Sequence, residues 1–356
     1  MPSQRTFNNL KYFFLLIYVL KFYVFPTKIL WNIPSEQCER TNSTKIDFSK
    51  YKIETNYHCK FRGEKIIVLY ENDVGLYPHL KNFSNGTIQY INGGLPQLVN
   101  ISEHLKKLGQ SIKNIITDKH FNGLAIIDIE EWRPTYDSNW SSKRVYQEES
   151  VRLVLKDKKF LNKTEAINLA KLQFDKAAFR FFYATLKMCK LLRPRAFWGF
   201  YGFPTCNENA QNRNWSFCFP EISNKMISFL KYADVIYPSP YIVPGQNYTV
   251  KSFFVREVLK ETNRIVEEIM RLGYGKKLIY VYNKIEVDPF VAKPKNIEFF
   301  DPYYLCIVYD NCVLHNVDGV IVWSTSKNMK ERCHYIKDYV DHIFGPHIKF
   351  LQLYSQ

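Results

Sequence analysis

After its first residues, the 356-residue sequence lacks internal repeats, low-complexity tracts and Pro/Gly-rich linkers. Features of this kind mark the boundaries between domains, so their absence favours one domain over residues 27–356. The composition is 46% hydrophobic and 16% aromatic, which supplies ample material for a core and argues against a disordered chain.

The sequence has fewer acidic than basic residues. The sequence has 34 Asp and Glu against 49 Lys and Arg, which gives a formal net charge of +15. It also lacks runs of Lys and Arg, zinc-finger spacings, RNA-binding strand motifs and basic helices, so we expect no nucleic-acid partner. The excess positive charge favours an acidic polysaccharide or another anionic surface as the partner. The alternative is a solvated basic surface without a partner.

Long hydrophobic runs are missing except near the start of the chain. The run Tyr12–Leu20 follows Arg5 and Lys11 and has the length of a signal-peptide core, which is too short for an ordinary membrane span. We therefore expect residues 1–26 to be a signal peptide and the protein to be secreted into the extracellular space. The alternative is an uncleaved anchor, because Lys21–Tyr23 is bulky where a cleavage site needs small residues.

Two further features favour the secretory pathway. Eight Asn-x-Ser/Thr sequons have no Pro in the middle, so each can accept a glycan, although some arise by chance. They begin at Asn42, Asn82, Asn85, Asn100, Asn139, Asn162, Asn214 and Asn247. The eight cysteines are an even number, as expected for disulfide bonds formed in an oxidising compartment.

Short apolar runs recur along the chain and are continuous rather than alternating, which is typical of strands buried on both faces of a parallel sheet. The seven runs occupy residues 28–33, 65–70, 123–129, 195–201, 234–237, 277–282 and 319–323. Helical patterns lie between them, the clearest over 167–188 with Thr164 as a candidate N-cap, whereas 135–160 has no clear pattern. This alternation predicts an α/β fold, either an open doubly wound sheet or a closed barrel. The number of strands favours a distorted TIM-like (β/α) barrel.

Acidic residues lie at the end of one apolar run, in GLAIIDIEEWRP (residues 123–134). Asp128 and Glu130 are two residues apart, so on a strand they share one face, whereas Glu131 points to the other face. Neighbouring carboxylates repel, so the pair holds one proton more tightly than an isolated acid, as a general acid requires. The adjacent residues add no metal ligand, so we expect neither a metal ion nor another cofactor.

Several other runs end in aromatic residues, and in a barrel these strand ends converge at the mouth of the active site. The strand-end aromatics are Tyr70, Tyr201, Tyr237, nearby Tyr241, Tyr282 and Trp323. Aromatic faces pack against sugar rings while hydroxyl groups donate hydrogen bonds to them. The pattern therefore predicts a carbohydrate site.

The stretch GLAIIDIEEWRPTYDSNW (residues 123–140) resembles the signature of the hyaluronidases, glycoside hydrolase family 56, in which Asp-x-Glu precedes Trp-Arg-Pro and then Asn-Trp. Other segments agree in order and spacing: LWNIPSEQC (30–38), RPRAFWGFYGFPTC (193–206), YPSPY (237–241), DGVIVWSTS (318–326) and FGPHIKF (344–350). The chain is most similar in character to the single-domain enzymes of insect venoms. The resemblance implies a barrel of about seven strands and endo-hydrolysis of β-1,4 linkages between N-acetylglucosamine and glucuronate in hyaluronan, with chondroitin as a further substrate.

The resemblance also implies roles for individual residues. In a substrate-assisted retaining mechanism, Glu130 would be the general acid and base, and Asp128 would orient the substrate acetamido group that acts as nucleophile. Tyr201, Tyr241 and Trp323 match the aromatic pocket around this group. Arg133 and Tyr70 match positions near the saccharide.

Disulfide pairing follows from the same resemblance, which pairs Cys38 with Cys333 and Cys206 with Cys218. The remaining Cys59, Cys189, Cys306 and Cys312 would be extra bridges or free thiols. The STSK stretch after Trp323 departs from the family, which usually has a Gly and a Ser run there. Two alternatives therefore stay open, a hyaluronan-binding or adhesion protein with little or no turnover, and an enzyme acting on another N-acetylated glycan.

Overall fold

The computed structural model describes residues 28–353 except 42, 85, 208, 210–215, 243, 244, 246 and 291–295. The predicted signal peptide, residues 1–26, and the sequon residues Asn42, Asn85 and Asn214 lie outside the described residues. Two compact units divide the rest. The first unit takes the described residues up to Lys60, Pro240–Leu259 and those from Tyr280 onward, and the second takes Phe61–Ser239 and Lys260–Ile279.

The second unit is built on buried parallel strands. Strands β3 (Ile66–Leu69), β6 (Leu124–Ile127) and β7 (Phe197–Phe200) form a sheet in the order β3-β6-β7. Strand β8 (Val235–Ile236) pairs in parallel with the first two residues of β9 (Leu278–Asn283). Gly199 lets β8 lie close to β7, because a Cβ there would be 2.1 Å from the carbonyl oxygen of Val235. The other strands of the second unit, in the described residues, are β4 (His79–Asn82) and β5 (Ile88–Ile91), which form an antiparallel hairpin.

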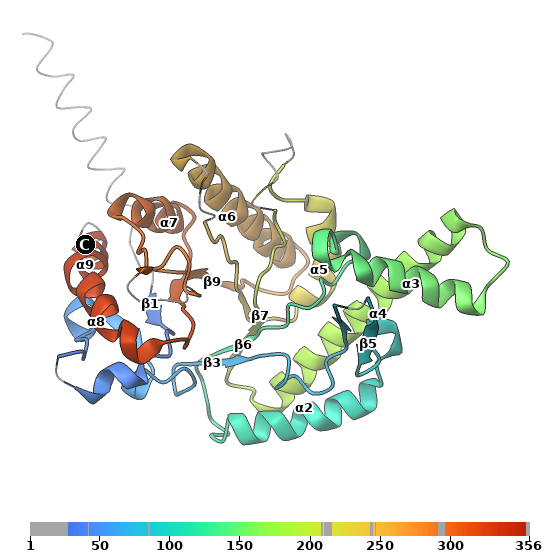
Figure 1. Ribbon diagram of the computed structural model, residues 1–356, viewed down its shortest axis with the longest axis horizontal. Helices are drawn as coiled ribbons and strands as arrows, with labels where there is room; N and C mark the ends of the chain where they lie inside the picture. The colour runs from blue at the N-terminus through green and yellow to red at the C-terminus, as the bar shows by residue number, and fades with distance from the viewer. Residues whose placement is uncertain are drawn as a thin grey trace, which may run out of the picture. The chain divides into compact units, whose positions relative to one another are not determined.

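Helix α4 (Lys163–Leu192) is the centre of the helical layer of the second unit. Helices α2 (Ile101–Ile115), α3 (Arg144–Asp157) and α5 (Pro220–Leu230) all pack against it (Figure 1). The predicted helix over 167–188 is therefore present but begins earlier. Its N-cap is Asn162 rather than Thr164, because Asn162 and Glu165 form a reciprocal capping box.

The first unit holds the other parallel strands, in the order β2-β1-β10-β9. Their bounds are β1 (Lys28–Trp31), β2 (Ile53–Thr55) and β10 (Gly319–Val322), with β9 entering from Tyr280 onward. The helices are α7 (Pro302–Leu314), α8 (Met329–Tyr339) and α9 (Gly345–Leu353), and α6 (Tyr248–Arg271) begins here and continues into the second unit. The disulfide Cys38–Cys333 ties the segment after β1 to α8.

All seven apolar runs are therefore strands, β1, β3, β6, β7, β8, β9 and β10, and every ladder among them is parallel. The α/β prediction is confirmed. Within the described residues, no helix is long and apolar enough to cross a membrane.

Candidate active site

Strand register brings three predicted site residues together at one edge of the sheet in the second unit. Leu69, Ile127 and Phe200 are register partners at the ends of β3, β6 and β7, and Tyr70, Asp128 and Tyr201 each come one residue later. The ladder continues past the strand ends, because the Asp128 N–H donates to Leu69 O at 2.8 Å and the Tyr201 N–H to Ile127 O at 3.0 Å. An acid thus lies between two tyrosines where the carboxyl ends of parallel strands meet.

Asp128 is half-buried, and its Oδ1 is fully buried and accepts no hydrogen bond from the described part of the chain. Loss of solvent raises the pKa of this carboxyl well above its usual value, and the charges of Glu130 and Glu71 raise it further. An unsatisfied carboxylate oxygen in such a place is costly, so Oδ1 is available to accept a hydrogen bond from a substrate N–H.

Glu130 keeps exposed surface, but the protein atoms around its carboxyl displace enough water to raise its pKa. Lys143 and Arg133 oppose this shift with positive charge, whereas Glu71 and Glu131 add to it. The Lys143 ammonium donates hydrogen bonds to the carbonyl oxygens of Glu130 and Glu131. A raised pKa lets Glu130 keep its proton to a higher pH than an ordinary glutamate does, as a proton donor to a leaving group requires.

Glu71 is a site residue that the sequence analysis missed. It follows Tyr70 directly after β3, and its Oε1 accepts the backbone N–H of Glu130 at 3.0 Å. Its charge raises the pKa of both Asp128 and Glu130. The signal was present in the sequence as an acid two residues past a strand end, one residue further on than Asp128 is from the end of β6.

The prediction that Glu131 lies on the opposite face depended on a strand through residue 131, but β6 ends at Ile127. Glu131 is exposed and lies near enough to Glu130 to raise the pKa of that carboxyl, as the last of the causes acting on it. It is therefore a weak contributor to the charge around Glu130.

Arg133 is held in place by a buried loop. Its backbone N–H donates to Asn139 Oδ1 at 2.8 Å, and Asn139 Nδ2 donates back to Arg133 O at 2.9 Å. The guanidinium donates to Ser138 O at 2.8 Å and lies over the Trp140 ring, 4.5 Å from its centroid. The Arg-Pro and Asn-Trp parts of the motif therefore have a structural role, because they hold the Arg133 cation near Glu130.

Asn139 also corrects one prediction. Its side chain is fully buried and its Nδ2 donates both to Arg133 O and to Thr135 O, at 2.9 and 2.8 Å. A glycan attached to Nδ2 would remove these bonds and has no space here, so the predicted glycosylation at Asn139 is wrong for this fold.

Comparisons with known proteins identify the family. A family model described as hyaluronidase matches residues 22–355. The chain belongs to the hyaluronidase family. A chondroitin hydrolase from Caenorhabditis elegans is 32% identical over 330 residues, which cover 91% of this chain and 69% of that protein. A hyaluronidase from Apis mellifera is 31% identical over 331 residues, which cover 91% of this chain and 84% of that protein.

A solved structure extends the likeness to the fold. Bee venom hyaluronidase in complex with a hyaluronic acid tetramer matches with a TM-score of 0.82 at 29% identity, over 91% of this chain and 99% of that one. The fold class is therefore the distorted TIM-like α/β barrel of the hyaluronidases, to which the seven parallel strands contribute, and the chain is a glycoside hydrolase of this family.

In this hyaluronidase fold, the two tyrosines beside Asp128 have defined surroundings. The Tyr70 ring stacks on Phe61 with a centroid distance of 5.8 Å and an interplanar angle of 4°. Tyr201 forms a parallel bridge to Tyr237, just past the ends of β7 and β8. The disulfide Cys206–Cys218 lies a few residues after Tyr201. Both predicted disulfides are thus present, and the four other cysteines are free thiols.

The remaining predicted aromatic residues, Tyr241 and Trp323, belong to the first unit. Trp323 follows β10, and its N–H donates to Asn283 O at the end of β9 at 2.8 Å. The Lys284 ammonium lies over the Tyr241 ring at 5.2 Å from its centroid. Each residue therefore stands beside a strand end, as the sequence predicted.

A buried ion pair supports the loop after Trp323. Glu286 and Arg332 are almost completely buried and form a salt bridge. Ser324 donates to Glu286 Oε2 at 2.6 Å and also lies 2.6 Å from an Arg332 nitrogen, while Arg332 donates to Thr325 O at 2.8 Å. The departure from the family sequence after Trp323 thus coincides with a hydrogen-bonded network of this chain's own residues.

Four described sequon asparagines remain exposed, Asn82, Asn100, Asn162 and Asn247. Asn100, Asn162 and Asn247 each accept a backbone N–H three residues ahead through Oδ1, at the starts of α2, α4 and α6. Helix capping through Oδ1 leaves Nδ2 directed to solvent, so capping and glycosylation are compatible at these positions.

Proposed function

We propose that this chain is a hyaluronoglucosaminidase, which cleaves β-1,4 linkages between N-acetylglucosamine and glucuronate inside hyaluronan chains. The observation that carries the proposal is the carboxyl pair at the end of β6, in which Glu130 has a raised pKa and Asp128 presents a buried, unsatisfied Oδ1. A protonated acid beside a hydrogen-bond acceptor is the pair that substrate-assisted glycoside cleavage needs. The hyaluronic acid tetramer bound to the bee venom relative supports the choice of polymer.

In the proposed reaction, Glu130 gives its proton to the glycosidic oxygen while the C1–O bond breaks. The carbonyl oxygen of the substrate acetamido group attacks C1 and forms a charged ring, whose N–H donates to Asp128 Oδ1. Water then attacks C1 from the face that the leaving group vacated, and the Glu130 carboxylate takes its proton. Two inversions give net retention, and the enzyme returns to its starting protonation state.

Neighbouring groups would tune and position this chemistry. Tyr70 and Tyr201 flank Asp128 and offer ring faces and hydroxyl groups to the sugar. Arg133 would hold the polymer by its charge near Glu130, close enough to lower the pKa of that carboxyl. We assign Tyr241 and Trp323 to contacts with the acetamido group from the family pattern.

The proposed substrate accounts for the composition of the chain. Hyaluronan carries one carboxylate for each disaccharide, and a protein of net charge +15 attracts such a polymer over long range. The exposed sequon asparagines and the two disulfides support a secreted, extracellular protein with residues 27–356 as one catalytic domain.

Hyaluronan zymography of the full chain tests the proposal. We expect Glu130→Gln, which keeps the shape but cannot donate the proton, to lower kcat by about 10²- to 10⁴-fold. Glu131→Gln is the matched control and should clear the gel like the wild type. Equal clearing by Glu130→Gln and the wild type would contradict the acid assignment. Hyaluronan binding without clearing by the wild type would favour a binding or adhesion protein.

Chondroitin is a second candidate substrate, because a relative that is 32% identical over 91% of this chain carries the name chondroitin hydrolase. The two polymers share glucuronate and differ in the hexosamine. Comparing kcat/KM on purified hyaluronan and unsulfated chondroitin decides between them. Turnover of neither polymer would direct the search to other N-acetylated glycans.

A further inference from the structure

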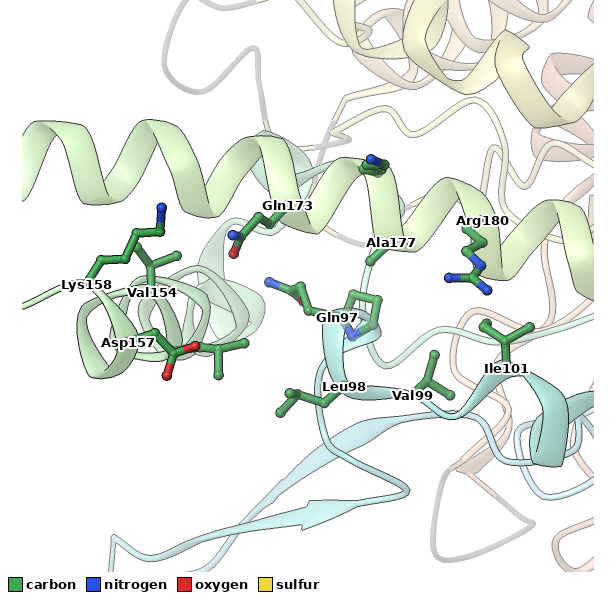
Figure 2. A pocket seen from close by; sticks show the side chains of 13 residues that line it. Gln97, Leu98, Val99, Ile101, Val154, Asp157, Lys158, Gln173, Ala177 and Arg180 are labelled. Carbon is green, nitrogen blue, oxygen red and sulfur yellow. The ribbon is translucent and has the colours of Figure 1, made fainter. Parts of the chain in front are cut away.

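A groove in the second unit lies between α3, α4 and the turn Pro96–Leu98 at the start of α2 (Figure 2). Its volume is about 430 Å³, which is in the usual range for a small-molecule or saccharide site. None of the residues of the candidate active site lines it. The groove is therefore a separate feature that the proposed reaction does not use.

Positive charge surrounds this groove. Lys158, Lys176 and Arg180 line it, against one acid, Asp157. None of the three cations forms an ion pair with a carboxylate in the described residues, although Lys and Arg elsewhere in this unit, such as Arg152 and Lys225, do so. Figure 2 shows Arg180 at one end of the groove and Lys158 at the other. An elongated ligand with anionic groups along its length would meet a cation at both ends.

The middle of the groove offers amide groups. Figure 2 shows Gln97 and Gln173 between the two cationic ends. Gln97 Nε2 donates to Ser150 Oγ at 2.9 Å, whereas its buried Oε1 accepts no hydrogen bond from the described residues. A buried carbonyl oxygen without a donor favours a ligand that carries hydroxyl or N–H groups.

The floor of the groove is aliphatic, with Leu98, Val99, Leu153, Val154 and Ala177 among its lining residues. Leu98 keeps 45% of its surface exposed, so it is accessible to a ligand. Such a floor packs against methyl groups and the C–H faces of sugar rings. A ligand must therefore combine anionic, hydroxyl and small apolar groups.

We propose that this groove is a second binding site for a polysaccharide that bears uronate carboxylates and N-acetyl groups. The carboxylates lie against Lys158, Lys176 and Arg180, a hydroxyl or N–H donates to Gln97 Oε1, and the acetamido methyl group packs on the aliphatic floor. The identity of the polymer rests on the proposed function, whereas the preference for an anion rests on the cations alone. Binding here would hold a long chain on the enzyme between successive cleavages.

Binding measurements on the full chain test this site. In a Glu130→Gln background, which prevents cleavage of the probe, we expect Lys176→Ala/Arg180→Ala to raise the Kd for high-molar-mass hyaluronan about tenfold. The salt dependence of binding should become shallower, because fewer cations meet the polymer. Lys106→Ala/Lys107→Ala is the matched control, since it removes two exposed cations of α2 that do not line the groove, and it should change the Kd little.

Steady-state kinetics without the Glu130 change give a second readout. The groove variant should raise KM for the polymer and leave its kcat unchanged. It should also leave kcat/KM unchanged for a short hyaluronan oligosaccharide that occupies the active site alone. An equal Kd in the groove variant and the control would overturn the proposal. The proposal would also be overturned if the groove variant lost the binding of dodecanoate, an amphiphilic anion, but bound the polymer as the wild type does. The groove would then be a site for amphiphilic anions. If the wild type cleaves no polymer but the groove variant still loses hyaluronan binding, the proposed function fails while this site stands.

Discussion

At the scale of single residues, Glu71 acts on Glu130 both as a hydrogen-bond acceptor and as a charge. Glu71→Gln separates the two effects, because Gln can still accept the Glu130 N–H but carries no charge. The Glu71 charge raises the pKa of Glu130, so its removal lowers that pKa, and the acid loses its proton at a lower pH. We expect the alkaline limb of the kcat/KM profile to move down by roughly half a unit to one unit.

Glu131→Gln is the control for this prediction. Glu131 is the weakest of the named influences on the pKa of Glu130, so its removal should move the same limb in the same direction by less. An upward shift in Glu71→Gln, or a larger shift in Glu131→Gln, would contradict the assignment. Glu71→Ala should also lower kcat, since it leaves the Glu130 N–H without its acceptor.

The sequence identifies some site residues and not others for a physical reason. Asp128 and Glu130 are recognisable because they break an apolar run and carry a motif. Glu71 acts through a partner 59 residues away, and the burial of Asn139 depends on how the loop after Pro134 closes. The contact of Glu71 and the burial of Asn139 both depend on the folded chain and not on neighbouring residues. The sequon at Asn139 therefore predicts a glycan, whereas the fold uses this side chain as a hydrogen-bonded amide.

At the scale of elements, the start of α4 offers a test of capping apart from glycosylation. Asn162→Ala removes the Oδ1 that accepts the Glu165 N–H at 3.0 Å, and should lower the free energy of unfolding by about 1 kcal/mol. Asn162→Asp keeps a capping oxygen but destroys the sequon, so it should stay near the wild type. Urea denaturation of unglycosylated protein makes the comparison, and equal losses in both variants would show that the cap contributes nothing.

The ion pair between Glu286 and Arg332 joins the loop after β9 to α8. Arg332→Met leaves a buried carboxylate without its partner and should lower the free energy of unfolding by roughly 3 to 5 kcal/mol. The double variant Glu286→Leu/Arg332→Met removes both charges and should recover most of this loss. Guanidinium denaturation measures both, and a double variant as unstable as Arg332→Met would refute the explanation by an unpaired charge.

Helices and strands were predicted correctly where the pattern that identifies them lies in neighbouring residues of the sequence. The strands were found because burial on both faces requires continuous apolar runs, and even two-residue β8 lies within such a run. Helix α3 was not predicted, because six of its 14 residues are charged and only part of one face is buried. The start of α4 was misplaced by two residues, since Thr164 and Asn162 are both good caps and only the reciprocal bond of Glu165 distinguishes them.

At the scale of the whole molecule, the two disulfides should differ in their effect on stability. Cys38–Cys333 spans 295 residues and Cys206–Cys218 spans 12. In the chain-entropy model these loops correspond to about 5.7 and about 2.8 kcal/mol of stabilisation. We expect Cys38→Ser/Cys333→Ser to lower the melting temperature more than Cys206→Ser/Cys218→Ser does, as measured by calorimetry. The reverse order would show that loop length does not control the effect.

The pairing of β1 with β10 has a consequence for the synthesis of the protein. Lys28 pairs with Gly319, so β1 leaves the ribosome about 290 residues before β10, its partner on one side, is made, whereas β2 on its other side follows directly. At typical elongation rates of 5 to 20 residues per second, the delay is roughly 15 to 60 s. The continuous stretch Phe61–Ser239 of the second unit can begin to fold in that interval, whereas the edge of β1 that pairs with β10 must wait. An unpaired strand edge is a template for association with other chains, so we expect this edge of β1 to need protection until translation is nearly complete.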